Sequence, residues 1–134
     1  MSRFDETKVN STSGTVTVGA GLTWDQVYET LEPTGVNVVG GRVPGVGIAG
    51  LTLGGGEYIY RRRAGFQMSS GFAYTSSEYG LTVDNVAAYE LVLPNGTVIN
   101  VTSKDEDLWF GLRVSTQAQY RLASLLRVFN CRGG

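Results

Sequence analysis

The sequence contains no histidine and only one cysteine, Cys131, among its 134 residues. The missing histidine excludes a Ser-His-Asp triad and removes the most common metal-ligating side chain from this chain. A single cysteine can form neither an internal disulfide nor a site made of several thiolates. The sequence therefore predicts no metal site, and it offers no residue that can be named as catalytic.

Charged residues and long apolar runs are scarce as well. The 11 basic and 12 acidic residues give a net charge of −1, which favours neither nucleic acid nor an anionic membrane surface as a partner. No apolar run is long enough to cross a bilayer. Met1 is not followed by an apolar signal segment, yet N-glycosylation triplets begin at Asn10, Asn95 and Asn100, so the localisation stays undetermined.

The first half of the chain predicts a hairpin followed by a helix. In residues 7–21, polar and apolar side chains alternate on both sides of a Ser- and Gly-rich centre, a pattern typical of two antiparallel strands. Thr23 and Gln26 form a capping-box pattern, and apolar residues follow at helical spacing until Pro33 ends the helix. Residues 36–41 then predict a short buried strand that leads into a glycine-rich loop.

The second half predicts another hairpin. Two β-rich runs within residues 84–103 flank an Asn-Gly pair, and a two-residue turn at that pair would place Val92 opposite Ile99. Hairpins and short helices in this order predict an α+β fold without repeats.

A second helix is expected after this hairpin, because Ser103 and Glu106 form another capping-box pattern. Its expected core-facing residues are Leu108, Trp109 and Leu112. Three tyrosines at core-like spacing are expected to pack rather than to catalyse: Tyr28, Tyr79 and Tyr89.

Glycine is abundant, with 19 residues, and it is concentrated in residues 40–56. Residues 45–50 match the GxGxxG pattern of dinucleotide-binding Rossmann domains. Such a domain also needs a long helix at these glycines and an acidic residue about 20 positions further on. A Gly-Gly-Gly run at 54–56 argues against the helix, and Ser70 stands where the acid is needed. Glycines that serve only tight turns are the other alternative, but their density favours a loop whose backbone approaches a planar or anionic ligand.

Two stretches carry a resemblance to a known family. VVGGRVPGVGIAGLTLGGG, at residues 38–56, and YGLTVDNVAAYELVLPNGTVINVTSKDEDLWFGLR, at residues 79–113, closely resemble FAD-linked oxidases of the vanillyl-alcohol-oxidase and berberine-bridge-enzyme superfamily, fungal branch. The resemblance covers Phe4 to Gly56 and Phe72 to about Arg113. It implies that residues 1–113 are part of an FAD-binding PCMH-type domain, mainly its second subdomain, with β-hairpins and short flanking helices.

The resemblance also implies a cofactor site. The glycine loop would run beside the isoalloxazine and the pyrophosphate of FAD, and residues 79–86 would lie along the ribityl and adenosine portion. Several contacts would be made by the backbone, where a glycine leaves room for the cofactor. The implied FAD contacts are Gly41, Val43, Gly45, Gly47, Ile48, Gly50, Leu51, Gly80, Leu81, Asp84 and Val86.

The sequence departs from the family at the covalent attachment of the flavin. Family members often link the flavin to a histidine, and some relatives link it to a cysteine where this sequence has Val43. This chain offers neither, so FAD would be held non-covalently if it binds at all. The family's substrate domain, which carries the catalytic base, is absent from this sequence, and the parent family is often secreted.

Residues 57–71 and 114–134 do not fit the family pattern. Joining Gly56 to Phe72 gives a continuous family sequence, so residues 57–71 are interpreted as an insertion and residues 114–134 as an unmatched tail. Codons at the start of each stretch can contain a splice-donor pattern, which leads to the hypothesis that both are translated intron. The alternative for residues 57–71 is a natural surface loop. The tail is expected to leave an edge of the second hairpin uncovered.

The resemblance therefore predicts the FAD-binding portion of an FAD-dependent oxidoreductase, an oxidase of small alcohol, sugar or alkaloid-like substrates. The alternative is a truncated, non-catalytic remnant that binds flavin weakly or not at all, since cofactor affinity depends on many contacts that converge on one site. An NAD-binding Rossmann domain is the third and least favoured hypothesis.

Overall fold

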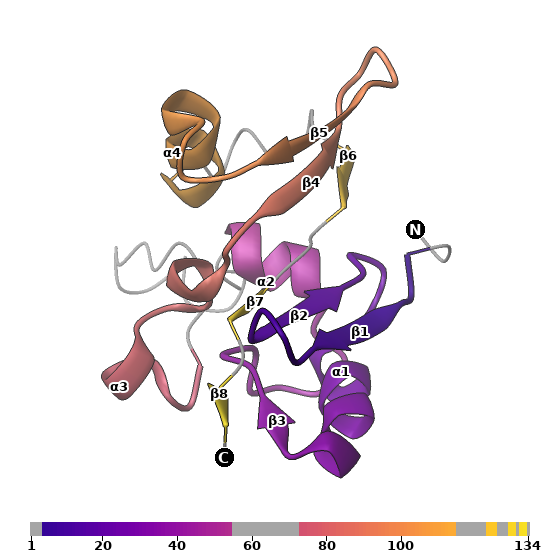
Figure 1. Cartoon of the computed structure of the whole chain (residues 1–134), viewed down its shortest axis with the longest axis vertical. Coiled ribbons are helices and arrows are strands. Elements are labelled where there is room, and N and C mark those ends of the chain that lie inside the picture. The colour runs from indigo at the N-terminus through magenta and orange to yellow at the C-terminus, as the bar shows by residue number, and fades with distance from the viewer. Residues whose placement is uncertain (1–3, 55–72, 115–122, 126–128, 131, 134) are drawn as a thin grey trace, which may run out of the picture.

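The computed structural model describes residues 4–54, 73–114, 123–125, 129–130 and 132–133. Residues 57–71, interpreted above as an insertion, lie outside this part of the chain. Short helices alternate with small antiparallel sheets (Figure 1), so the predicted α+β fold is confirmed. Within the described residues every strand pair is antiparallel, whereas a Rossmann domain needs parallel strands joined through a helix.

The first predicted hairpin is present. It consists of β1 (Thr7–Asn10) and β2 (Thr15–Val18), with Gly14 in the turn at a φ of +63°. A positive φ is accessible to glycine without steric cost, which suits this residue to the turn. Val16 and Val18 are fully buried and alternate with half-buried threonines, so one face of β2 lies on the core.

Helix α1 (Trp24–Leu31) begins where its capping pattern predicts. The Gln26 side chain accepts the Thr23 backbone N–H at 3.0 Å, which satisfies one of the free amides at the helix start. One face of the helix is buried, through Trp24, Val27 and Leu31.

The short helical turn η1 (Glu32–Thr34) follows α1, and Gly35 closes it at a φ of +66°. Strand β3 (Val36–Asn37) is shorter than the predicted strand of residues 36–41. Val38 and Val39 are buried outside any regular strand, so an apolar run alone did not define the length of the strand.

Helix α2 (Ile48–Gly54) forms where the glycine run argued against a helix. Its apolar residues decide the outcome, because Ile48, Leu51 and Leu53 are buried in the core. Tertiary packing of this kind overrides the low helix propensity of glycine. In Figure 1, α2 lies between the β1–β2 hairpin and the second hairpin.

Two short elements precede the second hairpin: helix α3 (Ser76–Tyr79) and the helical turn η2 (Thr82–Asn85). The hairpin itself, β4 (Tyr89–Val92) with β5 (Val98–Val101), forms as predicted, but its register is different.

In this hairpin Val92 lies opposite Val98 and not Ile99. The loop has three residues, because Leu93 and Thr97 close it and the Gly96 N–H donates to the Leu93 carbonyl at 2.9 Å. Pro94 favours the second position of a type I turn, and Gly96 follows at a φ of +82°. The proline thus replaces the two-residue Asn-Gly turn by a longer loop, which shifts the strands by one residue.

Helix α4 (Glu106–Val114) begins later than the Ser103 pattern predicts. Asp105 stands at the cap, where its carbonyl accepts the Trp109 N–H at 2.8 Å. Trp109 packs against the core as predicted, but Leu108 is 40% exposed.

The C-terminal tail supplies three strands: β6 (Ala123–Leu125), β7 (Phe129–Asn130) and β8 (Arg132–Gly133). They pair with β4, β2 and β3 respectively. In the described part of the chain the sheet order is β5-β4-β6, so the tail covers the β4 side of the second hairpin and the expected uncovered edge lies along β5. Strands of two or three residues carry too little alternation to be identified from sequence.

One apolar core joins these elements. Val16 of β2, Trp24 of α1, Ile48 of α2, Tyr89 of β4 and Leu112 of α4 belong to a single buried cluster. The chain crosses Trp24 at two successive glycines, where an added Cβ would lie 2.1 Å (Gly40) and 2.6 Å (Gly41) from the nearest ring atom. Only a residue without a side chain fits against the indole at these positions.

A Gly40→Ala substitution tests this packing. The added methyl group overlaps the buried Trp24 ring, and overpacking of this kind costs about 1–3 kcal/mol of unfolding free energy. Gly111→Ala, in helix α4, is the matched control, because an added Cβ there meets nothing within 4 Å. This substitution should raise the free energy of unfolding by about 0.5–1 kcal/mol, since alanine favours a helix more than glycine does. Urea unfolding of both variants gives the comparison, and equal stability of Gly40→Ala and wild type would contradict the packing.

A chain shortened to end at Arg113 tests the tail strands. Without β6 and β7, the central strands β4 and β2 each expose an unpaired edge, which favours association between copies. We expect oligomers or aggregates in size-exclusion chromatography with light scattering. The full chain carrying Ser124→Pro provides the milder variant, since proline disturbs β6 alone. A shortened chain that stays monomeric and as stable as the full chain would contradict these pairings.

Candidate functional site

The glycine loop, residues 40–47, is attached to α1 through side chains. The Asp25 carboxylate accepts the Gly45 N–H at 2.8 Å through Oδ1. One turn further along the helix, the Tyr28 hydroxyl donates to the Gly41 carbonyl at 3.0 Å. Both ends of the loop are therefore held by the same helix.

Backbone contacts attach the same loop to the segment that enters α1. The Trp24 N–H donates to the Val46 carbonyl at 3.0 Å, and the Ile48 N–H donates to the Leu22 carbonyl at 3.1 Å. Thr23 and Gly47 therefore lie opposite each other as an isolated antiparallel bridge, with these two hydrogen bonds on either side. The end of the loop is thus paired like a short strand with the segment that enters α1.

The protonation states of the two attaching side chains suit their roles. Two hydrogen bonds lower the pKa of Asp25 below its usual value. The larger effect comes from the Gly45 N–H and the smaller one from the Thr23 side chain. Burial raises the pKa of Tyr28 to about 12. At neutral pH, Asp25 is therefore an anionic acceptor for the loop amide, and Tyr28 is a neutral hydroxyl donor.

The predicted contacts on and after the loop separate into two groups. Gly41, Ile48 and Leu51 are buried, and they belong to the packing of the core. The members of the other group are exposed and follow one another along the loop and into α2: Val43, Gly45, Gly47 and Gly50. A Cβ built on any of these three glycines meets nothing within 4 Å, so the loop exposes open backbone at these glycines, beside the exposed side chain of Val43.

The second predicted segment, residues 79–86, is held by its own side chains. Asp84 accepts the Leu81 N–H at 3.0 Å. Asn85 is buried, and its amide group donates to the carbonyls of Tyr79 and Leu81, each at 2.9 Å. Val86 is only 4% exposed, so any contact it makes with a cofactor runs through its backbone.

Three residues that organise the site are not among the predicted FAD contacts: Asp25, Tyr28 and Asn85. Of these, the sequence favours a structural or cofactor-side role only for Asp25. All three act on backbone groups, and the first two reach a loop that is distant in the chain. Asp25 and Gly45 are 20 positions apart, so no local pattern marks them as partners. Tyr79, expected to pack, is 38% exposed, whereas Tyr89 is fully buried as predicted.

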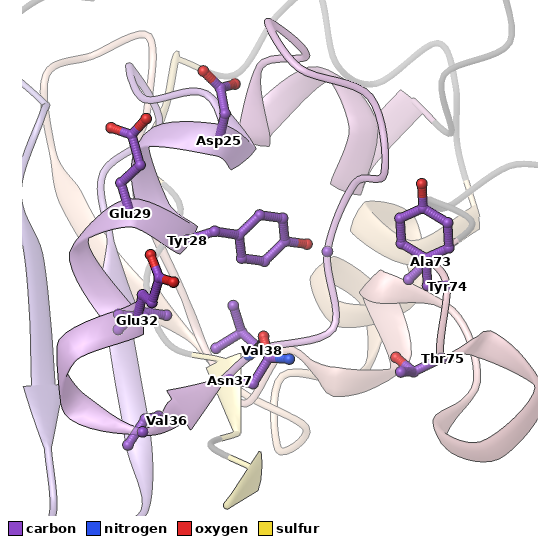
Figure 2. A pocket seen from close by; sticks show the side chains of 13 residues that line it. Asp25, Tyr28, Glu29, Glu32, Val36, Asn37, Val38, Ala73, Tyr74 and Thr75 are labelled. Carbon is purple, nitrogen blue, oxygen red and sulfur yellow. Dashed lines mark hydrogen bonds between the residues drawn. The ribbon is translucent and has the colours of Figure 1, made fainter. Parts of the chain in front are cut away.

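A cavity of about 640 Å³ lies next to the loop, and Gly40 is the one loop residue in its lining. Figure 2 shows Tyr28 pointing from α1 across this cavity toward the segment that carries Tyr74. None of the predicted FAD contacts is among its lining residues, and the helix contributes three carboxylates, from Asp25, Glu29 and Glu32. Because carboxylates repel the pyrophosphate of a dinucleotide, the cavity is a poor candidate for that part of the cofactor.

Comparisons with known proteins identify relatives of this chain. No protein-family model matches the chain. Among curated proteins, the FAD-dependent monooxygenase FUP4 of Fusarium proliferatum is 38% identical over 84% of this chain, and tpcD of Cochliobolus heterostrophus, also named an FAD-dependent monooxygenase, is 39% identical over 84%. The chain spans 19% of the length of each of these two relatives.

Among solved structures, the BBE-like 1 protein of Physcomitrella patens superposes with a TM-score of 0.78 and 28% identity, over 98% of this chain and 26% of that chain. The chain belongs to the berberine-bridge-like family of FAD-linked oxidoreductases. FgChi7B superposes with a TM-score of 0.76 and 26% identity, over 96% of this chain and 24% of that chain. The resemblance implies FAD contacts on the glycine loop and on residues 80–86, and these contacts stay predictions.

Within the described residues of this family member, no helix is long and apolar enough to span a membrane. The same part of the chain holds no group of three or more side chains suited to a metal ion.

The attachment of the loop through Asp25 predicts a pH dependence. Because the folded state lowers the pKa of Asp25 from its ordinary value of 3.8, its contribution to stability is present above pH 3.8 and is lost as the pH falls toward the folded-state pKa. Asp25→Asn should therefore be less stable than wild type near pH 6, with a difference that shrinks below pH 3.8. Chemical unfolding between pH 2 and pH 6 measures this, and a pH-independent difference would contradict it.

Proposed function

We propose that this chain forms one wall of the FAD site in an FAD-dependent oxidoreductase. The observation that carries the proposal is the outward face of the glycine loop, where Gly45, Gly47 and Gly50 leave open space that a side chain would fill. Residues 41–51 and 80–86 together are called the flavin wall below. Its first part would lie beside the isoalloxazine and the pyrophosphate, and its second part along the ribityl and adenosine portion.

The shape of this surface suits a flat cofactor. Bare backbone at these glycines lets a planar ring approach closely. The loop is also pre-organised by Asp25 and Tyr28, so the cofactor need not order it on binding. Binding then loses less conformational entropy than it would with a mobile loop.

We further propose that residues of this chain hold FAD without a covalent bond. The glucooligosaccharide oxidase of Acremonium strictum, a structural neighbour at 20% identity, is described as carrying 6-S-cysteinyl, 8α-N1-histidyl FAD. This chain has no histidine, and Val43, which is 61% exposed on the loop, stands where the resemblance puts the linking cysteine of some relatives. Hydrogen bonds and ring contacts are what these residues can supply.

For the whole protein, we propose oxidation of a small alcohol, sugar or alkaloid-like substrate. The curated relatives are named monooxygenases, and structural neighbours include a chitooligosaccharide oxidase and 6-hydroxy-D-nicotine oxidase. FAD supplies the redox chemistry when it is bound. The residues of this chain position it, and no group among them is assigned as the substrate's base.

The boundaries of the module are part of the proposal. Residues 1–113 form the family portion, residues 57–71 an insertion and residues 114–134 a tail without family match. The sequons at Asn10, Asn95 and Asn100 start at exposed residues, so all three asparagines are accessible to glycosylation if the protein is secreted.

Titration of the chain with FAD tests the proposal, with Gly47→Val as the decisive variant. A side chain at this position meets no protein atom within 4 Å of its Cβ, so the fold tolerates it, but it occupies the space proposed for the flavin. We expect saturable FAD binding with a perturbed flavin spectrum for wild type and an affinity reduced at least about tenfold for Gly47→Val, the equivalent of about 1.4 kcal/mol.

Gly111→Ala serves as the control, because it adds a Cβ in equally open space on α4, outside the flavin wall. Its FAD affinity should equal that of wild type. NADH is the comparison ligand, and binding of NADH without FAD would support the Rossmann alternative. A folded chain that binds neither would leave the non-catalytic remnant as the function.

A further inference from the structure

Asp84 contacts two parts of the chain at once. One carboxylate oxygen, Oδ2, accepts the Leu81 N–H at 3.0 Å, and the other, Oδ1, forms an ion pair with the Arg113 guanidinium. Arg113 lies in α4, 29 positions further along the chain. The ion pair therefore joins the second part of the flavin wall to a helix outside the wall.

Arg113 is itself oriented by an aromatic ring. Its guanidinium carbon lies 5.7 Å from the centroid of the Trp109 ring, one helical turn earlier in α4. Trp109 in turn packs against the fully buried Tyr89 of β4, with 5.3 Å between ring centroids. A cation held over an aromatic face loses orientational freedom, so Arg113 presents its charge to Asp84 from a site that is anchored in the core.

The backbone beside Asp84 has little room for adjustment. Gly80 has a φ of +79°, and a Cβ there would lie 3.0 Å from Asp84 Oδ2. Asn85 holds the carbonyls of Tyr79 and Leu81, whereas Asp84 holds the Leu81 amide. The two neighbouring side chains therefore control the carbonyl and amide groups of one short backbone stretch.

We propose that Arg113 is a positioning residue for the cofactor: by orienting Asp84, it sets the Gly80–Leu81 backbone that faces the adenosine portion of FAD. This inference rests on the proposed function. Arg113 was taken above only as the end of the family resemblance, and it is not among the predicted FAD contacts. It acts through Asp84 and does not itself need to touch the cofactor.

The ion pair is too exposed to matter chiefly as a source of stability. The side chains of Arg113 and Asp84 are 33% and 42% exposed, and exposed pairs contribute little to the free energy of unfolding because water and salt screen them. A guanidinium is nevertheless a directional partner, because its planar donors fix the orientation of a carboxylate. Orientation of Asp84, and through it of Leu81, is the larger consequence.

The test compares FAD with FMN, which lacks the adenosine portion. In Arg113→Gln, Asp84 loses its ion pair, and we expect FAD to bind about fivefold more weakly while the FMN affinity changes by less than about twofold. Asp84→Asn keeps an oxygen that can accept the Leu81 N–H but loses the charge, so it should give the same selective loss. The double variant should then be no weaker than either single one, because both remove the same interaction.

Two further variants separate positioning from general stability. Arg113→Lys keeps the charge without the planar fork, and it should restore part of the preference for FAD over FMN. Lys8→Gln removes an ion pair with Glu6 at 2.6 Å on the exposed surface of β1, and it should leave both affinities unchanged. Hydrogen exchange of the Leu81 amide in the cofactor-free chain should be faster in Arg113→Gln and unchanged in Lys8→Gln.

The outcomes are distinguishable. Selective loss of FAD affinity with faster Leu81 exchange supports the inference. Unchanged FAD affinity in Arg113→Gln, or an equal loss for FAD and FMN that follows a lowered melting temperature, overturns it while leaving the proposed function intact. A wild-type chain that binds no FAD overturns the proposed function, and the positioning role of Arg113 with it.

Discussion

The Trp24 indole is fully buried, and the chain returns across it at Gly40 and Gly41 so closely that no side chain fits at either position. Burial of a large aromatic side chain of this kind contributes on the order of 3 kcal/mol. The contact also sets the distance between α1 and the start of the glycine loop. The other attachments of the loop, from Asp25 and Tyr28, are possible only at that distance.

Glycines in this chain therefore have two physical roles that the sequence does not separate. Gly40 and Gly41 are small because a ring lies against them, and Gly45, Gly47 and Gly50 are bare on the side that faces away from the protein. Gly45 adds a further reason, since its φ of +78° is one that other residues adopt only under strain. A substitution in the first group acts on folding, whereas a substitution at Gly47 acts on what binds outside.

The sequence predicted those parts of the fold that depend on local signals. The capping pattern at Thr23 and the alternation in β1 and β2 gave correct elements, because their causes lie within a few residues of each other. The hairpin of β4 and β5 was predicted with the wrong register, since Pro94 outweighed the Asn-Gly pair beside it. Helix α2 was missed because its stability comes from contacts of Ile48 and its neighbours with distant elements.

The sequence predicts a site on the glycine loop, but it does not show how that loop is held. The glycine pattern and the family resemblance mark the loop, yet neither shows that Asp25 reaches Gly45 from another element. Long-range partners of this kind depend on how helices and loops are placed in space, and single-sequence patterns carry no such information. The tail strands were missed for the opposite reason, because they are too short to show any pattern.

Because the flavin wall is attached to the core of this chain, its geometry does not depend on the further segments that the longer relatives contain. The chain spans 19% of the length of its curated relatives, so many contacts to a cofactor would come from elsewhere in a whole protein. Affinity adds over contacts from both sides, whereas the geometry of this wall depends on hydrogen bonds from α1 and on Trp24. A partner segment would therefore change how tightly a flavin is held more than where this wall places it.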